Sequence, residues 1–100
     1  MEQVIFKFKS KLWVYAGPSA WHFLSVPKKL SAELKNRYND RTRGFGSLPV
    51  KIKIGDTQWR TSIFPDSKTS TYLLPVKLAV RKKENIFEGS MVSCEISIRD

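Results

Sequence analysis

The chain has 100 residues, which is enough for one domain over residues 1–100 and too few for a second hydrophobic core. Hydrophobic residues make up 41% and charged residues 27%, proportions that are typical of a folded protein and argue against disorder. Lys and Arg number 18 against 9 Asp and Glu, so the net charge of +9 favours an anionic partner.

The numbers of cysteine and histidine residues further limit the class of protein. Cys94 is the single cysteine, so the chain cannot form an internal disulfide, and with one histidine it is not expected to build a zinc site. Residues 1–7 lack the continuous apolar stretch of a signal peptide, and no segment approaches the roughly 18 apolar residues of a membrane span. We therefore expect a cytoplasmic protein with no membrane segment, no metal and no other cofactor.

Alternation of residue type over 4–15 predicts a long, half-buried strand. One face, interrupted by Ser10, carries the apolar residues Val4, Phe6, Phe8, Leu12 and Val14. The other face carries Lys7, Lys9 and Lys11 and is extended by the rings of Trp13 and Tyr15. The strand should therefore bury one face and present a basic, partly aromatic face outward.

Turn residues at 16–19 end this strand, and a second strand is expected over 21–26, closed by Pro27. A short helix is predicted over 31–38, with Ser31 as its N-cap. The polar loop that follows, 39–47, should be mobile.

Local sequence patterns also predict the elements of residues 50–98. Strands 50–54 and 57–64 form a predicted hairpin around a Gly-Asp turn, a short strand over 71–74 ends at Pro75, and a second helix is expected over 76–83. The last strand, 91–98, places Cys94 on an apolar face, which predicts a buried and inert thiol.

Two stretches echo each other. Residues 26–30 and 74–78 share the pattern Pro-x-Lys-Leu after an apolar residue, and each is expected to join a strand to a helix entered through its proline. Either an internal repeat or local helix-entry chemistry would produce this pattern.

Several motifs resemble a small bacterial family, the domain of unknown function 1905 family. They are Trp21-His22-Phe23, Ile54-Gly55, Trp59-Arg60-Thr61-Ser62, Phe64-Pro65, residues 72–76 and Val80-Arg81-Lys82. The resemblance implies a mainly β fold: a small closed β-pseudobarrel, double-split barrel-like, capped by two short α-helices. It also implies similarity to the swapped-hairpin barrel of AbrB and MazE transcription factors, with residues 74–92 similar to an AbrB-type repeat although Ser90 replaces its usual acidic residue. The family carries no established reaction.

The candidate anion-binding residues are basic side chains in the loop, the hairpin and the second helix. They are Arg37, Arg41, Arg43, Lys51, Lys53, Arg60 and Arg81. Arginine is the better phosphate ligand because its guanidinium forms a two-pronged contact. Rings that would stack on unpaired bases are Trp13, Tyr15 and Phe45. The competing interpretation is structural, since lysines on strand edges also deter sheet aggregation and Arg60 would bridge strand ends to helix carbonyls.

These features favour a non-enzymatic binding module with a basic surface for nucleic acid or another polyanion. One alternative is an accessory domain that recognises another protein. A second is an enzyme with a site near His22 and Arg60, because imidazole is a common general base. No nucleophile stands in a recognisable catalytic frame and no carboxylates are paired, so we assign no catalytic residue.

Overall fold

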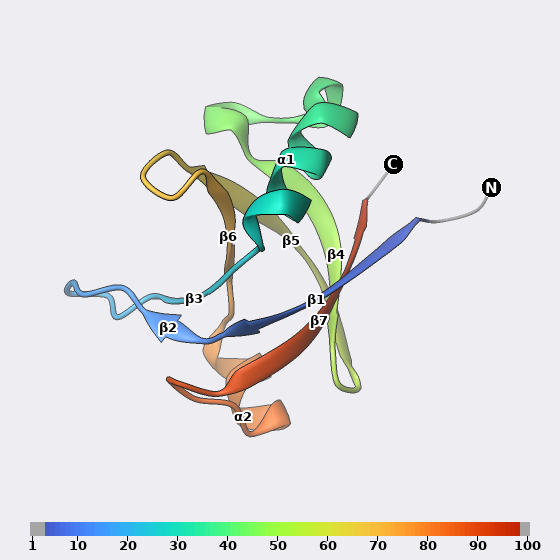
Figure 1. The fold of residues 1–100 in the computed structure, drawn as a ribbon. Helices are drawn as coiled ribbons and strands as arrows, with labels where there is room; N and C mark the ends of the chain where they lie inside the picture. Colours follow the sequence, from blue (N-terminus) through green and yellow to red (C-terminus); the bar gives the residue numbers. More distant parts are fainter. Residues whose placement is uncertain (1–3, 99–100) are drawn as a thin grey trace.

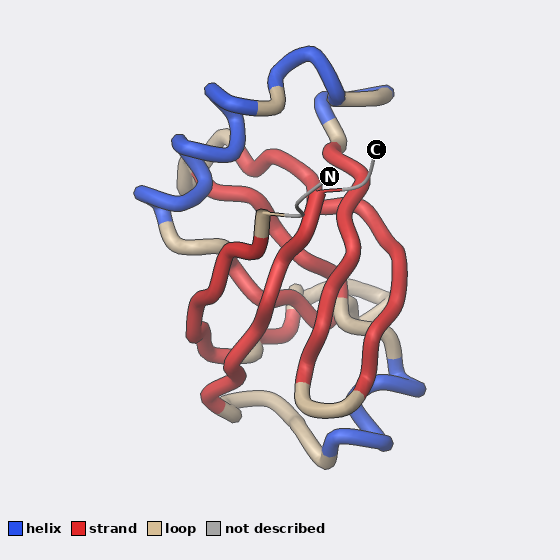
Figure 2. The backbone as a smooth tube through the Cα atoms, turned by 90° about the vertical axis from the view of Figure 1, so that its right-hand side faces the viewer, coloured by secondary structure: helices blue, strands red, loops and turns tan. Residues whose placement is uncertain are grey.

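The computed structural model describes residues 4–98, so part of the 1–7 segment lies outside the described residues. Seven strands form one sheet in the order β1-β7-β4-β5-β6-β3-β2 (Figure 1). Their bounds are β1 Ile5–Lys11, β2 Trp13–Val14, β3 His22–Ser25, β4 Leu48–Ile54, β5 Thr57–Asp66, β6 Thr71–Pro75 and β7 Met91–Ile98. Helices α1 (Lys28–Arg37) and α2 (Leu78–Glu84) lie at opposite ends of the curled sheet, and two 3₁₀ turns, η1 (Asn39–Arg41) and η2 (Gly44–Gly46), follow α1 (Figure 2).

The sheet curls until its two edges come from one segment of chain. The edge strands β1 and β2 are separated only by Leu12, where the chain leaves β7 and begins to pair with β3. Ser10 Oγ donates to the Ser25 carbonyl at 2.8 Å, and Trp13 Nε1 donates to Ser25 Oγ at 2.9 Å, which ties this segment to β3. The predicted long strand is therefore interrupted at Leu12, and the prediction of a mainly β, barrel-like fold with two short helices is confirmed, with the sheet curled into a half-barrel.

The chain folds as two similar halves. Each half contributes a long strand, a shorter partner strand, a helix and a final strand: β1/β2, β3, α1 and β4, then β5, β6, α2 and β7. The long strand of each half pairs with the final strand of the other, β1 with β7 and β5 with β4. The equivalent strands also pair with each other antiparallel, β3 with β6 and β4 with β7. The topology thus has an approximate two-fold relation with exchanged strands.

The core lies inside the curl, and its residues follow the predicted alternation. Phe8 and Leu12 are buried on the inward face of the first strand, and Val92, Cys94, Ile96 and Ile98 are buried on the inward face of β7. Val4 departs from the prediction: it precedes β1, has no strand partner and is 43% exposed. Burial of this apolar set supplies the main stabilisation of a domain of this size.

Both helices begin at residues other than those predicted. Helix α1 starts at Lys28 directly after Pro27, three residues before the predicted start at Ser31, because a proline suits the position that precedes the first turn. Helix α2 starts at Leu78 and not at Val76, because the Val76 N–H still donates to the His22 carbonyl at 2.9 Å and continues the β6–β3 pairing. Pro75 is accordingly the last residue of β6 and not the entry to the helix.

Ser31 is not an N-cap. It is the fourth residue of α1, where its hydroxyl donates to the Val26 carbonyl at 2.9 Å and accepts from the Tyr72 N–H at 3.0 Å. The serine therefore joins the helix to β6 inside the core, at 4% exposure.

We predict that Ser31→Ala lowers the free energy of unfolding by about 1–3 kcal/mol, because it leaves the buried Tyr72 N–H without a partner. Urea unfolding measures the effect. Ser93→Ala, at an exposed position of β7, is the matched control and should change stability little. Equal effects of the two variants would contradict the bridging role.

The predicted hairpin is confirmed, and its two strands, β4 and β5, are each longer than predicted. Its tip contacts α2: Thr57 Oγ1 donates to Glu84 Oε2 at 2.6 Å. Gly55 has a φ of +57°, and a Cβ atom there would overlap the Glu84 carboxylate, so both the turn and the approach of the helix require glycine.

Candidate functional site

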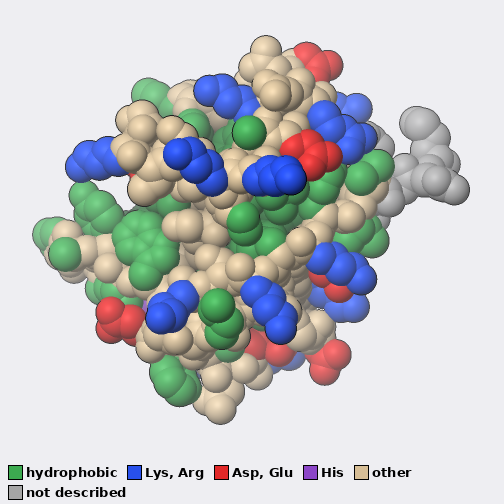
Figure 3. Space-filling view, in the orientation of Figure 1, with side chains coloured by type: hydrophobic (Ala, Val, Ile, Leu, Met, Phe, Trp, Pro, Cys, Tyr) green, Lys and Arg blue, Asp and Glu red, His purple; other side chains and the backbone are tan. Residues whose placement is uncertain are grey.

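The outer face of β1, β7, β4 and β5 is basic. It carries Lys7, Lys9, Lys11, Lys51, Lys53 and Arg60, and the acidic side chains among the described residues of these strands on that face are Glu95 and, at the far end of β5, Asp66. The strand register places Glu95 between Lys7 and Lys53. Figure 3 shows basic side chains over much of one face of the molecule, with fewer acidic ones among them.

Lys51 and Arg60 stand directly opposite each other in the β4–β5 register. Like charges at this spacing repel, which destabilises the strand pair in the absence of a counter-ion. Within the described part of the chain, none of the six basic residues of the outer face forms an ion pair. The face is therefore suited to an anionic partner.

The loop arginines lie at the α1 end, away from this row of lysines. Arg37 forms an ion pair with Glu33 at 3.3 Å, and its guanidinium lies 5.6 Å from the Phe6 ring and 5.5 Å from the Tyr38 ring. The Arg41 guanidinium also lies over the Tyr38 ring, 5.8 Å from its centroid. Arginine–aromatic contacts of this kind hold the guanidinium in place at the surface.

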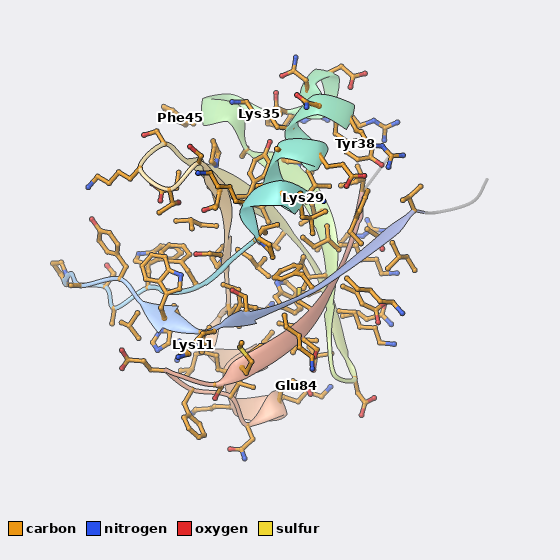
Figure 4. The ribbon with its side chains drawn as sticks, in the orientation of Figure 1. Lys11, Lys29, Lys35, Tyr38, Phe45 and Glu84 are labelled. Atoms are coloured by element: carbon orange, nitrogen blue, oxygen red, sulfur yellow. The ribbon has the colours of Figure 1, made fainter. Side chains whose placement is uncertain are left out.

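The three candidate stacking rings do not form one platform. Trp13 is half-buried against Phe23 at 5.3 Å between ring centroids, and its indole N–H is bonded to Ser25. Tyr15 is exposed in the loop after β2, whereas Phe45 is fully exposed in η2 at the α1 end (Figure 4). Phe45 has a φ of +59°, which is unusual for a residue other than glycine.

A cleft of ≈ 330 Å³ opens beside α2. Residues from β3 and the loop before it, from β5, and from the segment between β6 and α2 line it: Ser19, Ala20, Trp21, His22, Trp59, Arg60, Thr61, Pro75, Val76, Lys77 and Arg81. The structure thus brings together Arg60 and Arg81, which were predicted from the sequence, with His22. Lys77 and Trp21 were not predicted as part of a site.

His22 and Arg81 are connected in this cleft although 59 residues separate them. Arg81 Nε donates to the Val76 carbonyl at 3.1 Å, and Nη1 lies 3.3 Å from His22 Nε2. His22 Nδ1 lies 2.8 Å from the Ala20 carbonyl. A carbonyl only accepts, so Nδ1 carries the proton and Nε2 accepts from the arginine. Ala20 has a φ of +45°, a strained conformation for alanine at the rim of the cleft.

A family model described as "Domain of unknown function (DUF1905)" matches residues 8–96. The chain belongs to the DUF1905 family. The match covers every residue that lines the cleft and, of the six basic residues of the outer face, all but Lys7. No curated protein matches the chain.

The enzymatic alternative for this DUF1905 domain meets an obstacle at His22. Both ring nitrogens are hydrogen-bonded, so neither is free to take a proton from a nucleophile. The sequence offers Ser25, Ser62 and Cys94 as nucleophiles: Ser25 accepts the Trp13 indole N–H, Ser62 is half-buried on β5, and Cys94 lies in the core. Among residues 4–98 there is no cluster of metal-ligating side chains, and no helix is long and apolar enough to cross a membrane.

Cys94 is buried in β7, as predicted, and burial raises the pKa of its thiol to about 12, with a further contribution from the negative charge of Glu95. At pH 8 such a pKa leaves roughly one thiol in ten thousand ionised, whereas a thiol near pKa 9 is about one-tenth ionised. The thiolate is the reactive form.

We therefore predict that a thiol reagent labels the native DUF1905 domain at pH 8 at least about a hundred times more slowly than the urea-unfolded chain, because both burial and the raised pKa oppose reaction. Mass spectrometry over time measures the two rates. Similar rates in the two states would contradict a buried, protonated thiol.

Proposed function

We propose that this DUF1905 domain is a non-enzymatic module that binds nucleic acid, duplex in preference to single strands, through the outer face of β1, β7, β4 and β5. The observation that carries the proposal is the set of six basic side chains on this face, none of which forms an ion pair with another described residue, against the two acidic residues Glu95 and Asp66. Sequence-independent nucleic-acid binding rests on such contacts to phosphates.

The two-fold relation between the halves supports a duplex as the ligand. The β4–β7 pair lies at the centre of the face, and the long strands β1 and β5 flank it. Lys9 on β1 and Arg60 on β5 occupy equivalent places, each opposite the central strand of the other half, because Trp13 opposite Phe23 corresponds to Phe64 opposite Leu73. Duplex DNA presents phosphates with local two-fold symmetry, which two-fold proteins match.

Stacking of unpaired bases on Trp13 has less support, because this side chain already donates its indole N–H to Ser25 and packs against the Phe23 ring. The likeness to AbrB and MazE transcription factors belongs to the same proposal. Residues 74–92 span the end of β6, all of α2 and the start of β7, and the exchange of strands between halves supports that likeness.

The test is a fluorescence titration of the purified chain with labelled single- and double-stranded oligonucleotides of unrelated sequences at about 50 and 200 mM salt, a range over which phosphate contacts change affinity strongly. We expect tighter binding to duplex, little sequence preference and marked weakening at the higher salt. Absence of binding at the lower salt would overturn the proposal and favour the accessory-domain alternative.

A further inference from the structure

The cleft beside α2 has an equivalent position at the other end of the barrel, and the two positions are built differently. Ser31 and Arg81 are each the fourth residue of their helix, and each donates to the carbonyl of the valine that precedes the helix N-cap. At α1 the serine side chain is buried within the core. At α2 the same position carries a guanidinium that borders an open cleft.

The fold does not require an arginine at this position, since Ser31 makes the equivalent bond to Val26 with a single hydroxyl. Arg81 makes this bond through Nε and adds the contact to His22. Its other N–H donors have no partner among the described residues. A guanidinium held at two of its nitrogens, with donors left over, is prearranged for a ligand that accepts hydrogen bonds.

The remaining lining determines the charge of that ligand. Arg60 and Lys77 add two cations to Arg81, and none of the described residues that line the cleft is acidic. Cations that share a cleft without a counter-ion favour an anion there. Phosphate suits this set because an arginine fork contacts two of its oxygens at once, with lysine as an additional point charge.

An apolar groove adjoins the cleft. It has a volume of ≈ 320 Å³, is lined by Tyr15, Trp21, Phe23, Phe64, Leu73 and Pro75, and shares Trp21 and Pro75 with the cleft. Trp21 is 54% exposed, and its ring is stacked on Phe23 with 6.0 Å between centroids. A rigid indole at the boundary of the two spaces offers a flat surface to a ring bound beside the anion.

We propose that the cleft and the groove together bind a phosphate monoester carried by a flat aromatic group, the chemistry of a nucleoside monophosphate. The phosphate contacts Arg81 and Lys77, and the ring lies against Trp21. The cleft shares Arg60 with the outer face, but Arg81 and Lys77, which contact the phosphate, lie outside that face. The site is therefore an addition to the nucleic-acid interface and does not depend on the outer-face lysines.

NMR titration of the full chain with adenosine 5′-monophosphate tests the proposal, with adenosine and inorganic phosphate as the partial probes. We expect the indole N–H signals of Trp21 and Trp59 to shift, and the monophosphate to bind more tightly than either partial probe. Arg81→Gln should weaken binding about tenfold or more, because a charge-assisted hydrogen bond is lost. Lys77→Gln, at an exposed position, should weaken it less and keeps the test valid if the Arg81 variant unfolds.

Arg43→Gln removes an exposed charge at the opposite end of the barrel and is the matched control, expected to bind the monophosphate normally. Equal affinity for all three probes, or monophosphate binding unchanged by Arg81→Gln and Lys77→Gln, would overturn the site. A Lys7→Gln/Lys53→Gln variant separates the two proposals: it should lose duplex affinity while its affinity for the monophosphate stays unchanged.

Discussion

Phe8→Asp is expected to unfold the domain, whereas Lys9→Asp is expected to leave it folded. Phe8 is buried inside the curl, opposite Cys94 on β7, while Lys9 is exposed on the outer face opposite Ser93. Removing a buried Phe side chain costs about 3–5 kcal/mol, and burying a carboxylate in its place adds to that cost. A domain of this size has a total stability of about 5–15 kcal/mol, so the substitution removes most or all of it.

Circular dichroism and urea unfolding measure both variants. Lys9→Asp should shift stability by about 0.5 kcal/mol or less, as is usual for exposed positions. Phe8→Leu serves as an intermediate that stays folded with a loss of roughly 1–2 kcal/mol, because it changes the shape of the core without adding charge. Similar losses for Phe8→Asp and Lys9→Asp would show that the assigned inward face of β1 is wrong.

The elements that could be predicted from the sequence are those decided by local patterns. Alternation marks the inward faces of β1 and β7, and the Gly55-Asp56 turn marks the hairpin. Each of these signals lies within about ten residues of chain, the range over which periodicity and turn chemistry act.

The break at Leu12 could not be predicted in this way, because it depends on where β7 ends its pairing and β3 begins it. The starts of the helices depend on tertiary contacts as well. Val76 pairs with His22 across the β3–β6 interface, which keeps two residues of the expected helix extended. Propensity is a weak guide wherever a strand partner competes for the same backbone groups.

The sequence echo of 26–30 and 74–78 is displaced from the structural equivalence. The Val26 N–H donates to the Tyr72 carbonyl, and the Val76 N–H donates to the His22 carbonyl, both at 2.9 Å. Val26 therefore corresponds to Val76, and the N-cap Pro27 corresponds to the N-cap Lys77 and not to Pro75. A proline pattern alone could not establish this register, because the pairing that defines it joins residues about half the chain apart.

The candidate site residues also fall into two groups: those that local sequence patterns predict and those that depend on tertiary contacts. The outer-face lysines follow from strand alternation and were predicted as basic strand faces. The contact between His22 and Arg81 was not predicted, because it is made across β3 and α2 and leaves no local trace in either segment. In the register of the two motifs Ser31 aligns with Ala79, so the correspondence of Ser31 with Arg81 becomes visible only once the helices are aligned.

Replacing two outer-face lysines is expected to have the largest effect on nucleic-acid binding. If Lys7, Lys51, Lys53 and Arg60 each neutralise a phosphate, the logarithm of the duplex affinity should fall with the logarithm of salt concentration with a slope of about −3.6. Over a fourfold rise from about 50 to about 200 mM this corresponds to a loss of roughly a hundredfold. Lys7→Gln/Lys53→Gln should bring the slope to about −1.8, because two released counterions are lost from the binding equilibrium.

The matched control is Lys28→Gln/Lys29→Gln, which removes the same charge from exposed positions at the start of α1. Long-range attraction depends on net charge and is reduced equally in both double variants, whereas the salt slope counts the cations that contact phosphates. Titrations at four or more salt concentrations would separate the two effects. A slope that changes by the same amount in both variants would mean that the whole basic surface attracts the duplex without a defined interface. A slope that changes only for Lys7 and Lys53 would locate the phosphates on the face formed by β1, β7, β4 and β5.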